Sequence, residues 1–178
     1  MVQPKLILLN GFAGSGKSTI VKRYIHEHPL ALIIEGDELI VNIGQWRKHE
    51  VQARELIFEL TKSMARTYLA SNHDVLLPYL VTDARHVETF EKIAQACDAT
   101  FHEILLHNNR ADAIARLLKR GTWGEADQDP LSDKDTPAIE DLMSKMESER
   151  EQRPNTQTIP IKQGDIDHTY QLFIDCLV

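Results

Sequence analysis

Short apolar runs alternate along the chain with longer stretches that have helical spacing. Residues 5–10 and 30–35 are almost continuously apolar and too short for helices, a pattern typical of strands buried on both faces of a parallel sheet. Between them, residues 19–28 form a predicted helix that ends before Pro29. The N-terminal part therefore predicts a strand, a loop, a helix and a second strand.

The same alternation continues to the C-terminus. Residues 51–70 carry apolar positions at helical spacing, and residues 75–81 predict a third strand, although Pro78 cannot donate to a strand ladder. The other predicted elements are a helix that Thr82 or Asp83 caps and that runs through Cys97, a strand over 100–106, a helix over 110–120 between the cap Asn109 and the stop Gly121, a helix over 138–153, a strand over 158–161 and a helix over 165–177.

Residues 121–137 interrupt this alternation. The segment is rich in glycine, proline and acidic residues and has little apolar content, which predicts a flexible surface segment. Its acids lack the spacing of a calcium loop, so we assign them no metal. Together the elements predict one domain over residues 1–178, an α/β fold of three layers with a five-stranded parallel sheet and helices on both faces.

Composition and charge narrow the class of partner. The 178 residues include 27 acidic against 20 basic ones, for a formal net charge of −7. Because a polynucleotide-binding surface normally needs clustered Lys and Arg, nucleic acid is unlikely as a partner and a small molecule is favoured. The chain has no apolar run of membrane-spanning length and no signal-peptide pattern, and its two cysteines are far apart. These features predict a cytoplasmic protein without a membrane partner.

A glycine-rich loop lies between the first predicted strand and the first predicted helix. Residues 11–18, GFAGSGKS, match G-x-x-x-x-G-K-[ST] at every defined position. In such a loop, backbone N–H groups and the helix N-terminus point at a polyphosphate, while Lys17 adds positive charge and the Ser18 hydroxyl completes a Mg²⁺ shell. The loop predicts ATP and Mg²⁺ as cofactors. The predicted cofactor-binding residues are Gly11, Ala13, Gly14, Ser15, Gly16, Lys17, Ser18 and Thr19.

This loop, the Gly36-Asp37 pair after the second strand, and an arginine-rich helix before an acidic segment resemble the small P-loop kinases over nearly the whole chain. The chain is most similar to the branch that includes gluconate kinases, chloramphenicol phosphotransferase, polynucleotide kinases and zeta-toxin-type kinases. The resemblance implies an enzyme that transfers the γ-phosphoryl group of Mg-ATP to a hydroxyl of a small molecule, such as a sugar acid or a nucleoside.

The resemblance also implies a role for Asp37. In that branch an acidic residue just beyond the second strand approaches the acceptor hydroxyl, and Asp37 matches it, which makes it the candidate base. Residues 77–81 carry no acid of the Walker B kind, so Asp37 is also a candidate Mg²⁺ ligand, directly or through water. A third interpretation is that Asp37 caps the start of a helix.

Several arginines are candidates for contacts with the acceptor. Arg47 and Arg54 follow Asp37 closely, and Trp46 beside them is either a pocket or a core residue. Arg85 lies just past the third predicted strand, where open α/β sheets place ligand groups, and could hold an acceptor anion. An exposed pair of Arg85 with Asp83 at a helix start is the alternative.

The resemblance further implies a lid over residues 110–137. Related kinases use lid arginines to neutralise the charge that develops during transfer, and closure excludes water. Arg110, Arg116 and Arg120 lie on the predicted helix before the flexible segment, and Arg116 and Arg120 are i,i+4 neighbours. We therefore predict Lys17, Asp37, Arg116 and Arg120 as catalytic residues. The alternative interpretation of the arginines is that they form a solvated basic face of the helix.

Three other functions fit parts of the pattern. A GTPase would need a D-x-x-G motif, which the sequence lacks, so Asn109 is better explained as a helix cap. A nucleoside-monophosphate or shikimate-type kinase shares the fold, and Arg47, Arg54 and Arg85 leave it open. A nucleotide-binding regulator with weak ATPase activity would share the loop, but it would not need Asp37 as a base.

Overall fold

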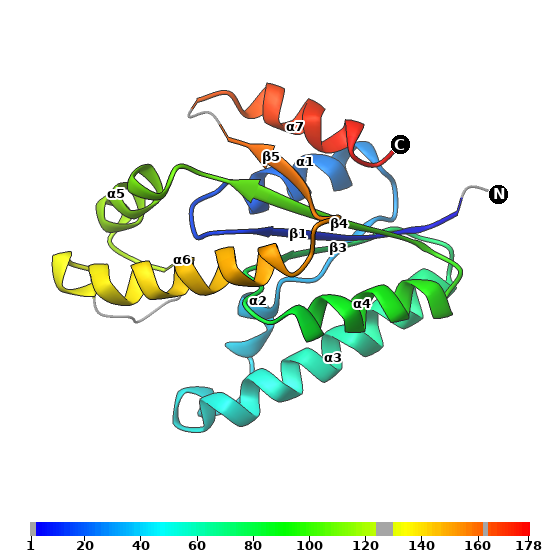
Figure 1. Cartoon of the computed structure of the whole chain (residues 1–178). Helices are drawn as coiled ribbons and strands as arrows, with labels where there is room; N and C mark the ends of the chain where they lie inside the picture. The colour runs from blue at the N-terminus through cyan, green and yellow to red at the C-terminus, as the bar shows by residue number, and fades with distance from the viewer. Residues whose placement is uncertain (1–2, 124–129, 162–163) are drawn as a thin grey trace.

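Residues 3–123, 130–161 and 164–178 are described in the computed structural model, and they form a sheet with helices on both faces (Figure 1). All strand pairs are parallel, in the order β2-β3-β1-β4-β5. The predicted three-layer fold with a five-stranded sheet is confirmed. The strands are β1 (Lys5–Gly11), β2 (Leu32–Ile33), β3 (Val75–Tyr79), β4 (Thr100–His107) and β5 (Gln157–Pro160). The longer helices are α1 (Lys17–Glu27), α3 (Glu50–Ala70), α4 (Ala84–Ala96), α5 (Arg110–Arg120), α6 (Thr136–Glu151) and α7 (Ile166–Asp175).

The central strand β1 is buried on both faces. Because side chains alternate along a strand, Leu6 and Leu8 join a core with α3 and α4, while Ile7 and Leu9 join a second core with α1 and α7. All four side chains are completely buried. The C-terminal end of β1, where the glycine-rich loop begins, is therefore held in the middle of the sheet. Within the described ranges, no helix has the length and apolar character needed to cross a membrane.

Two predicted strands differ from those observed by more than one residue at an end. β2 has only two residues instead of the predicted six, and β3 ends at Tyr79. Pro78 nevertheless belongs to β3, in register with Leu9 of β1. The pairing of β3 with β2 ends at Leu76, so the missing N–H of Pro78 removes no hydrogen bond toward that neighbour.

Two short elements between β2 and α3 were not predicted. They are α2 (Gly36–Ile40) and the 3-10 helix η1 (Trp46–His49). Ile40 and Trp46 pack against Ala53 and Ile57 of α3 in a small separate core, so Trp46 is a core residue. Elements this short do not show a helical period in sequence, which is why the pattern did not reveal them.

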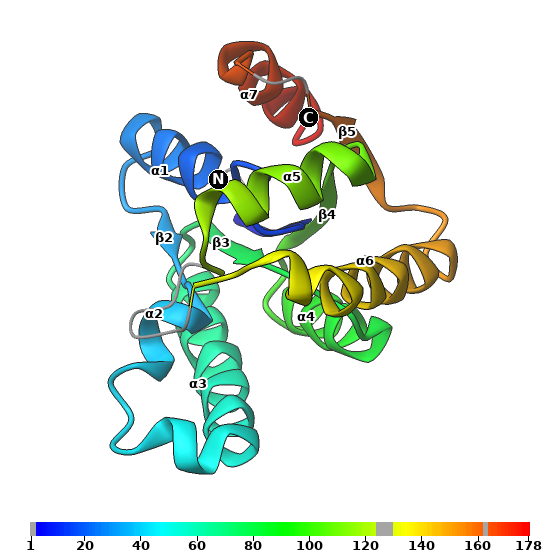
Figure 2. The same cartoon turned by 90° about the vertical axis from the view of Figure 1, so that its left-hand side faces the viewer.

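The helices α5 and α6 form a hairpin beyond the carboxyl end of the sheet, and Figure 2 shows α5 crossing in front of that end. α5 has the predicted bounds, with Asn109 and Gly121 as its caps. Helical structure resumes at η2 (Asp133–Asp135) and α6, so the predicted flexible segment 121–137 is wrong at its C-terminal end. A capping box between Ser132 and Asp135 stabilises this earlier start. Residues 124–129 of the segment lie outside the described residues.

Candidate functional site

The glycine-rich loop connects β1 to α1 as the sequence predicts. Gly16 is the N-cap of α1 and has a φ of 93°, a left-handed conformation that favours glycine. At Gly11, an added Cβ would lie 2.7 Å from Ser15 Oγ and 3.0 Å from the carbonyl oxygen of Leu106 in β4. The loop is thus packed tightly against the end of β4. Its N–H groups, with the start of α1, have the arrangement that binds phosphate.

The ammonium group of Lys17 turns back onto this loop. Nζ donates hydrogen bonds to the carbonyl oxygens of Gly11 at 2.5 Å and Phe12 at 3.1 Å. Both acceptors are neutral backbone atoms, so they do not cancel the positive charge of the ammonium. A polyphosphate can therefore take over these hydrogen bonds.

Charged groups from α2 and α5 lie close enough to Lys17 to influence its pKa. Burial lowers the pKa of the Lys17 ammonium to about 8, while the negative charges of Asp37 and then Glu35 act in the opposite direction and the positive charge of Arg120 lowers it further. The structure therefore brings together Lys17, Asp37 and Arg120, which lie far apart in the sequence.

We expect Mg-ATP binding to weaken above about pH 8. Phosphate binds the charged ammonium, and the pKa of Lys17 near 8 means that the free protein loses this charge as the pH rises. Raising the pH from 7 to 9 should increase the Kd by about tenfold, and the complex should take up a proton near pH 8. Isothermal titration in buffers of different ionisation enthalpy measures both effects.

The variant Lys17→Arg is the control for this pH dependence, because guanidinium stays charged throughout the range. It should bind Mg-ATP with little change between pH 7 and 9. A flat pH profile in the unmodified protein would contradict the assignment of the titration to Lys17.

Glu35 is a site residue that the sequence interpretation missed. It is the N-cap residue of α2, and its carboxyl group lies close enough to Ser18 for that side chain to act to lower its pKa. Burial raises the pKa of Glu35, and a hydrogen bond with Glu38 contributes in the same direction. Its Oε1 is buried and has no hydrogen-bond partner among the described residues. The sequence signal that could have identified it is an acidic residue at the end of the predicted second strand, two residues before Asp37.

Asp37 lies in the first turn of α2, where its side chain is exposed. The N-cap position belongs to Glu35, so Asp37 is not the helix cap that was one of its interpretations. Its charge also helps to raise the pKa of Tyr79, whose phenol is otherwise affected mainly by burial. Asp37 is therefore near the end of β3 as well as near Lys17.

Gly36 sets the distance between α2 and β3. A Cβ at this position would lie 2.8 Å from Tyr79 Oη and 3.3 Å from a methyl carbon of Ile57. The Tyr79 hydroxyl is itself held by a 2.9 Å hydrogen bond with Thr61 Oγ1. The absence of a side chain at Gly36 thus lets α2 approach β3 closely.

We expect Gly36→Ala to destabilise the protein by about 1–3 kcal/mol, because the added methyl group must displace Tyr79 or α2. Urea unfolding followed by circular dichroism measures the change. Gly44→Ala is the matched control, since a Cβ there meets no atom within 4 Å, and it should change stability by about 0.5 kcal/mol or less. Equal effects of the two substitutions would contradict the close approach at Gly36.

The three arginines of α5 have different surroundings. Arg120 is exposed and close enough to lower the pKa of Lys17. Arg116 Nε donates to the backbone oxygen of Asp112 at 3.1 Å, one turn earlier in the helix. Arg110 instead connects α5 to α6, through contacts with Glu147 Oε2 at 3.2 Å, Ser144 Oγ at 2.9 Å and the carbonyl of Glu140 at 2.8 Å.

Two of the arginines that we predicted to contact the acceptor, Arg85 and Arg47, interact with neighbouring side chains of the protein. Arg85 forms an ion pair with Asp83, the N-cap residue of α4, and 85% of its side chain is exposed. The Arg47 guanidinium lies over the ring of Trp46, 4.6 Å from its centroid. Arg85 thus has the helix-start pairing that was its alternative, although an exposed pair of this kind is weak enough to exchange partners.

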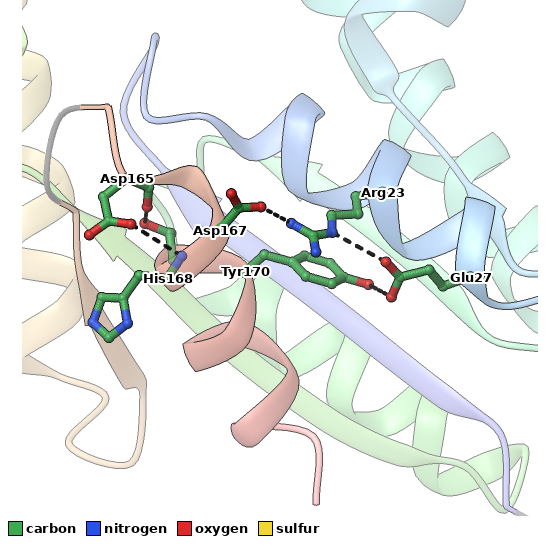
Figure 3. Close-up of polar contacts among 7 residues, drawn as sticks. Arg23, Glu27, Asp165, Asp167, His168 and Tyr170 are labelled. Atoms are coloured by element: carbon green, nitrogen blue, oxygen red, sulfur yellow. Dashed lines mark hydrogen bonds and ion pairs between the residues drawn. The ribbon is translucent and has the colours of Figure 1, made fainter.

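The start of α7 forms one wall beside the loop. The Ile166 side chain lies 3.8 Å from where a Cβ of Gly16 would be. Figure 3 shows how α7 is attached to α1: Arg23 bonds Asp167 at 2.6 Å and Glu27 at 3.2 Å, while the Tyr170 hydroxyl donates to Glu27 at 2.7 Å. This network fixes the first turn of α7 next to the phosphate-binding loop.

The residues around Ser18 are suited to Mg²⁺. The ion prefers oxygen ligands and usually keeps several water molecules, so it needs few protein groups. Ser18 offers a hydroxyl and Glu35 a carboxylate with one buried oxygen that has no partner among the described residues. Within the same residues, no group of three or more His, Cys, Asp and Glu side chains could hold a metal by itself. Phosphate oxygens would have to supply the other ligands.

The parallel sheet and the glycine-rich loop after its central strand define the fold of the small P-loop kinases. The chain belongs to the AAA_33 family of AAA domains, which matches residues 6–154. The APS kinase CysC of Mycobacterium tuberculosis, solved with AMPPNP and APS, aligns with a TM-score of 0.62 and 19% identity over 99% of both chains. A chain of the Pnkp1/Rnl/Hen1 RNA repair complex aligns with a TM-score of 0.65 and 18% identity, over 85% of this chain and 47% of that one. No curated protein sequence matches this chain.

Proposed function

We propose that the protein is an ATP-dependent phosphotransferase that moves the γ-phosphoryl group of Mg-ATP to a hydroxyl of a small molecule. The observation that carries the proposal is that Asp37 and Arg120 lie close enough to Lys17 for their charges to shift the pKa of its ammonium. A protein that only binds nucleotide needs the loop and its lysine. A phosphotransferase also needs a carboxylate for the acceptor and a cation for the transferred group, and both are near this ammonium.

In the proposed reaction, the acceptor oxygen forms a bond to the γ-phosphorus while the bond from phosphorus to the β,γ-bridging oxygen breaks. The electron pair of that bond leaves with ADP. Asp37 orients the acceptor hydroxyl and accepts its proton. Lys17, Arg116 and Arg120 neutralise the negative charge on the phosphoryl oxygens during transfer.

We propose that Ser18 and Glu35 hold the magnesium ion, with Asp37 as a further ligand or the base. Bound Mg²⁺ would neutralise charge on the β- and γ-phosphates. The Glu35 carboxylate is near enough to Ser18 for that side chain to influence its pKa, and near enough to Lys17 to influence the pKa of the ammonium, so we assign it the role of the acid that the end of β3 lacks. Its raised pKa means that cation binding should displace a proton when the carboxyl is protonated.

For the acceptor, we propose a small molecule contacted by Arg47 and Arg85, in a cytoplasmic enzyme. The chain's net charge of −7 disfavours a polynucleotide. The similarity to a chain of an RNA repair complex makes RNA the alternative to test. Arg85 can turn to an anionic acceptor by leaving Asp83, since its side chain is largely exposed.

A screen of ATP consumption tests this function. The protein is incubated with Mg-ATP and sets of sugar acids, nucleosides, nucleotides and short RNAs with 5′-hydroxyl ends, and products are identified by mass spectrometry. We expect one phosphorylated small molecule for each ADP formed. ATP binding without consumption in every set would support a nucleotide-binding regulator, and phosphorylated RNA would support a nucleic-acid kinase.

A further inference from the structure

One side chain of the phosphate-binding loop faces away from the phosphate site. Phe12 occupies a variable position of the motif, and its side chain is only 1% exposed. It belongs to a core shared with β4 and with both helices of the α5–α6 hairpin. The other buried members of this core are Leu105, Ala113, Leu117, Ile139, Met143 and Met146.

The residues after α5 also contact Phe12. The Trp123 ring meets the Phe12 ring edge-on, with centroids 5.9 Å apart and an interplanar angle of 71°. Trp123 follows Arg120 by three residues, after the helix ends at Gly121. The contact therefore joins the loop to the end of α5 that carries Arg120.

The backbone of Phe12 is hydrogen-bonded within the phosphate-binding loop and to the start of α1. Its carbonyl oxygen accepts hydrogen bonds from Lys17 Nζ and from the Ser15 N–H, both at 3.1 Å. When phosphate takes the Lys17 ammonium, this carbonyl loses one of its donors. Phe12 thus contacts the Lys17 ammonium through its carbonyl oxygen and the hairpin through its ring.

The hairpin can transmit a shift of Phe12 because its two helices are firmly joined. Arg110 of α5 bonds Glu147, Ser144 and the backbone of Glu140 in α6. The shared apolar core adds to this connection. A displacement at the Phe12 ring should therefore move α5 and α6 together rather than bend one of them.

We propose that the Phe12–Trp123 contact couples the phosphate-binding loop to the α5–α6 hairpin, so that bound phosphate sets the position of Arg116 and Arg120. Phe12 and Trp123 are then positioning residues, which act through the arginines. The inference rests on the proposed function, because it requires a nucleotide in the loop.

Tryptophan fluorescence tests the coupling. The chain has two tryptophans, so Trp46→Phe leaves Trp123 as the only tryptophan, and excitation at the red edge of its absorption avoids the tyrosines. Saturating Mg-AMPPNP should shift the emission maximum of Trp123 and change its quenching by acrylamide, with occupancy established by isothermal titration. In Phe12→Met, which keeps an apolar side chain of similar volume without the ring, the shift should disappear at saturation. A shift that persists in this variant overturns the proposal.

Hydrogen exchange gives a second measurement that needs no fluorescent residue. Mg-AMPPNP should slow exchange of the α5 amides in the unmodified protein and in Trp123→Phe, which keeps an aromatic ring, but not in Trp123→Leu. Equal slowing in Trp123→Leu contradicts the coupling. If titration shows nucleotide bound while neither probe responds, only this inference fails; if no nucleotide binds, the proposed function fails with it.

Discussion

Replacing Lys17 with alanine should abolish the rise in melting temperature that Mg-ATP produces. A ligand that binds only the native state at a hundredfold excess over its Kd stabilises a protein by about 2.7 kcal/mol, which is about 5–10 °C for a chain of this size. The substitution removes the ammonium that now bonds Gly11 and Phe12 and that faces the phosphates in the proposed complex. Differential scanning fluorimetry with and without Mg-ATP measures the shift.

Lys92→Ala is a control for the loss of one positive charge, since Lys92 is an exposed residue of α4. It should retain the full shift. Circular dichroism of both variants without nucleotide shows whether they are folded. If Lys17→Ala is folded and keeps the shift of the unmodified protein, the loop does not bind the nucleotide as we propose.

Replacing Asp37 with asparagine should reduce phosphoryl transfer by at least about hundredfold, because the amide cannot accept the proton of the acceptor. ATP affinity at pH 7 should change little. Asp37 raises the pKa of Lys17, so its loss favours the neutral amine, but a pKa of about 8 leaves room for Lys17 to remain largely charged at pH 7. Turnover with the acceptor found in the screen, together with calorimetric titration of Mg-ATP, measures both quantities.

The Mg²⁺ dependence of Glu35→Gln, compared with that of Asp37→Asn, shows which of the two acids is a metal ligand and which is the base. If Glu35 holds Mg²⁺, this variant should require about 10–100-fold more Mg²⁺ for half-maximal turnover and recover activity when Mg²⁺ is raised. Asp37→Asn should not recover in this way if Asp37 is the base. Recovery of Asp37→Asn at high Mg²⁺ would assign Asp37 to the metal, and full turnover of that variant would remove it from the mechanism.

Several features outside the loop were beyond sequence reasoning for identifiable reasons. Glu35 is the last residue of the predicted second strand, but only the structure shows that its carboxyl group lies near Ser18. Arg110 and Arg116 are both arginines of the same helix, so the sequence did not distinguish them. In the structure, Arg110 joins α5 to α6 because its guanidinium bonds Glu147 of α6. The pairing of Phe12 with Trp123 spans more than a hundred residues, and no local pattern indicates it.

By itself, the sequence determined the order of the strands and long helices along the chain and the place of the phosphate-binding loop. These depend on local periodicity and on residues adjacent in the chain, whose geometry the backbone largely dictates. The tertiary structure decided which distant charges meet at Lys17. The order β2-β3-β1-β4-β5 places the end of β2 and the start of α5 on opposite sides of β1. Because α5 then crosses in front of this end of the sheet (Figure 2), Arg120, the last residue of α5, and Asp37 in α2 both lie close enough to influence Lys17.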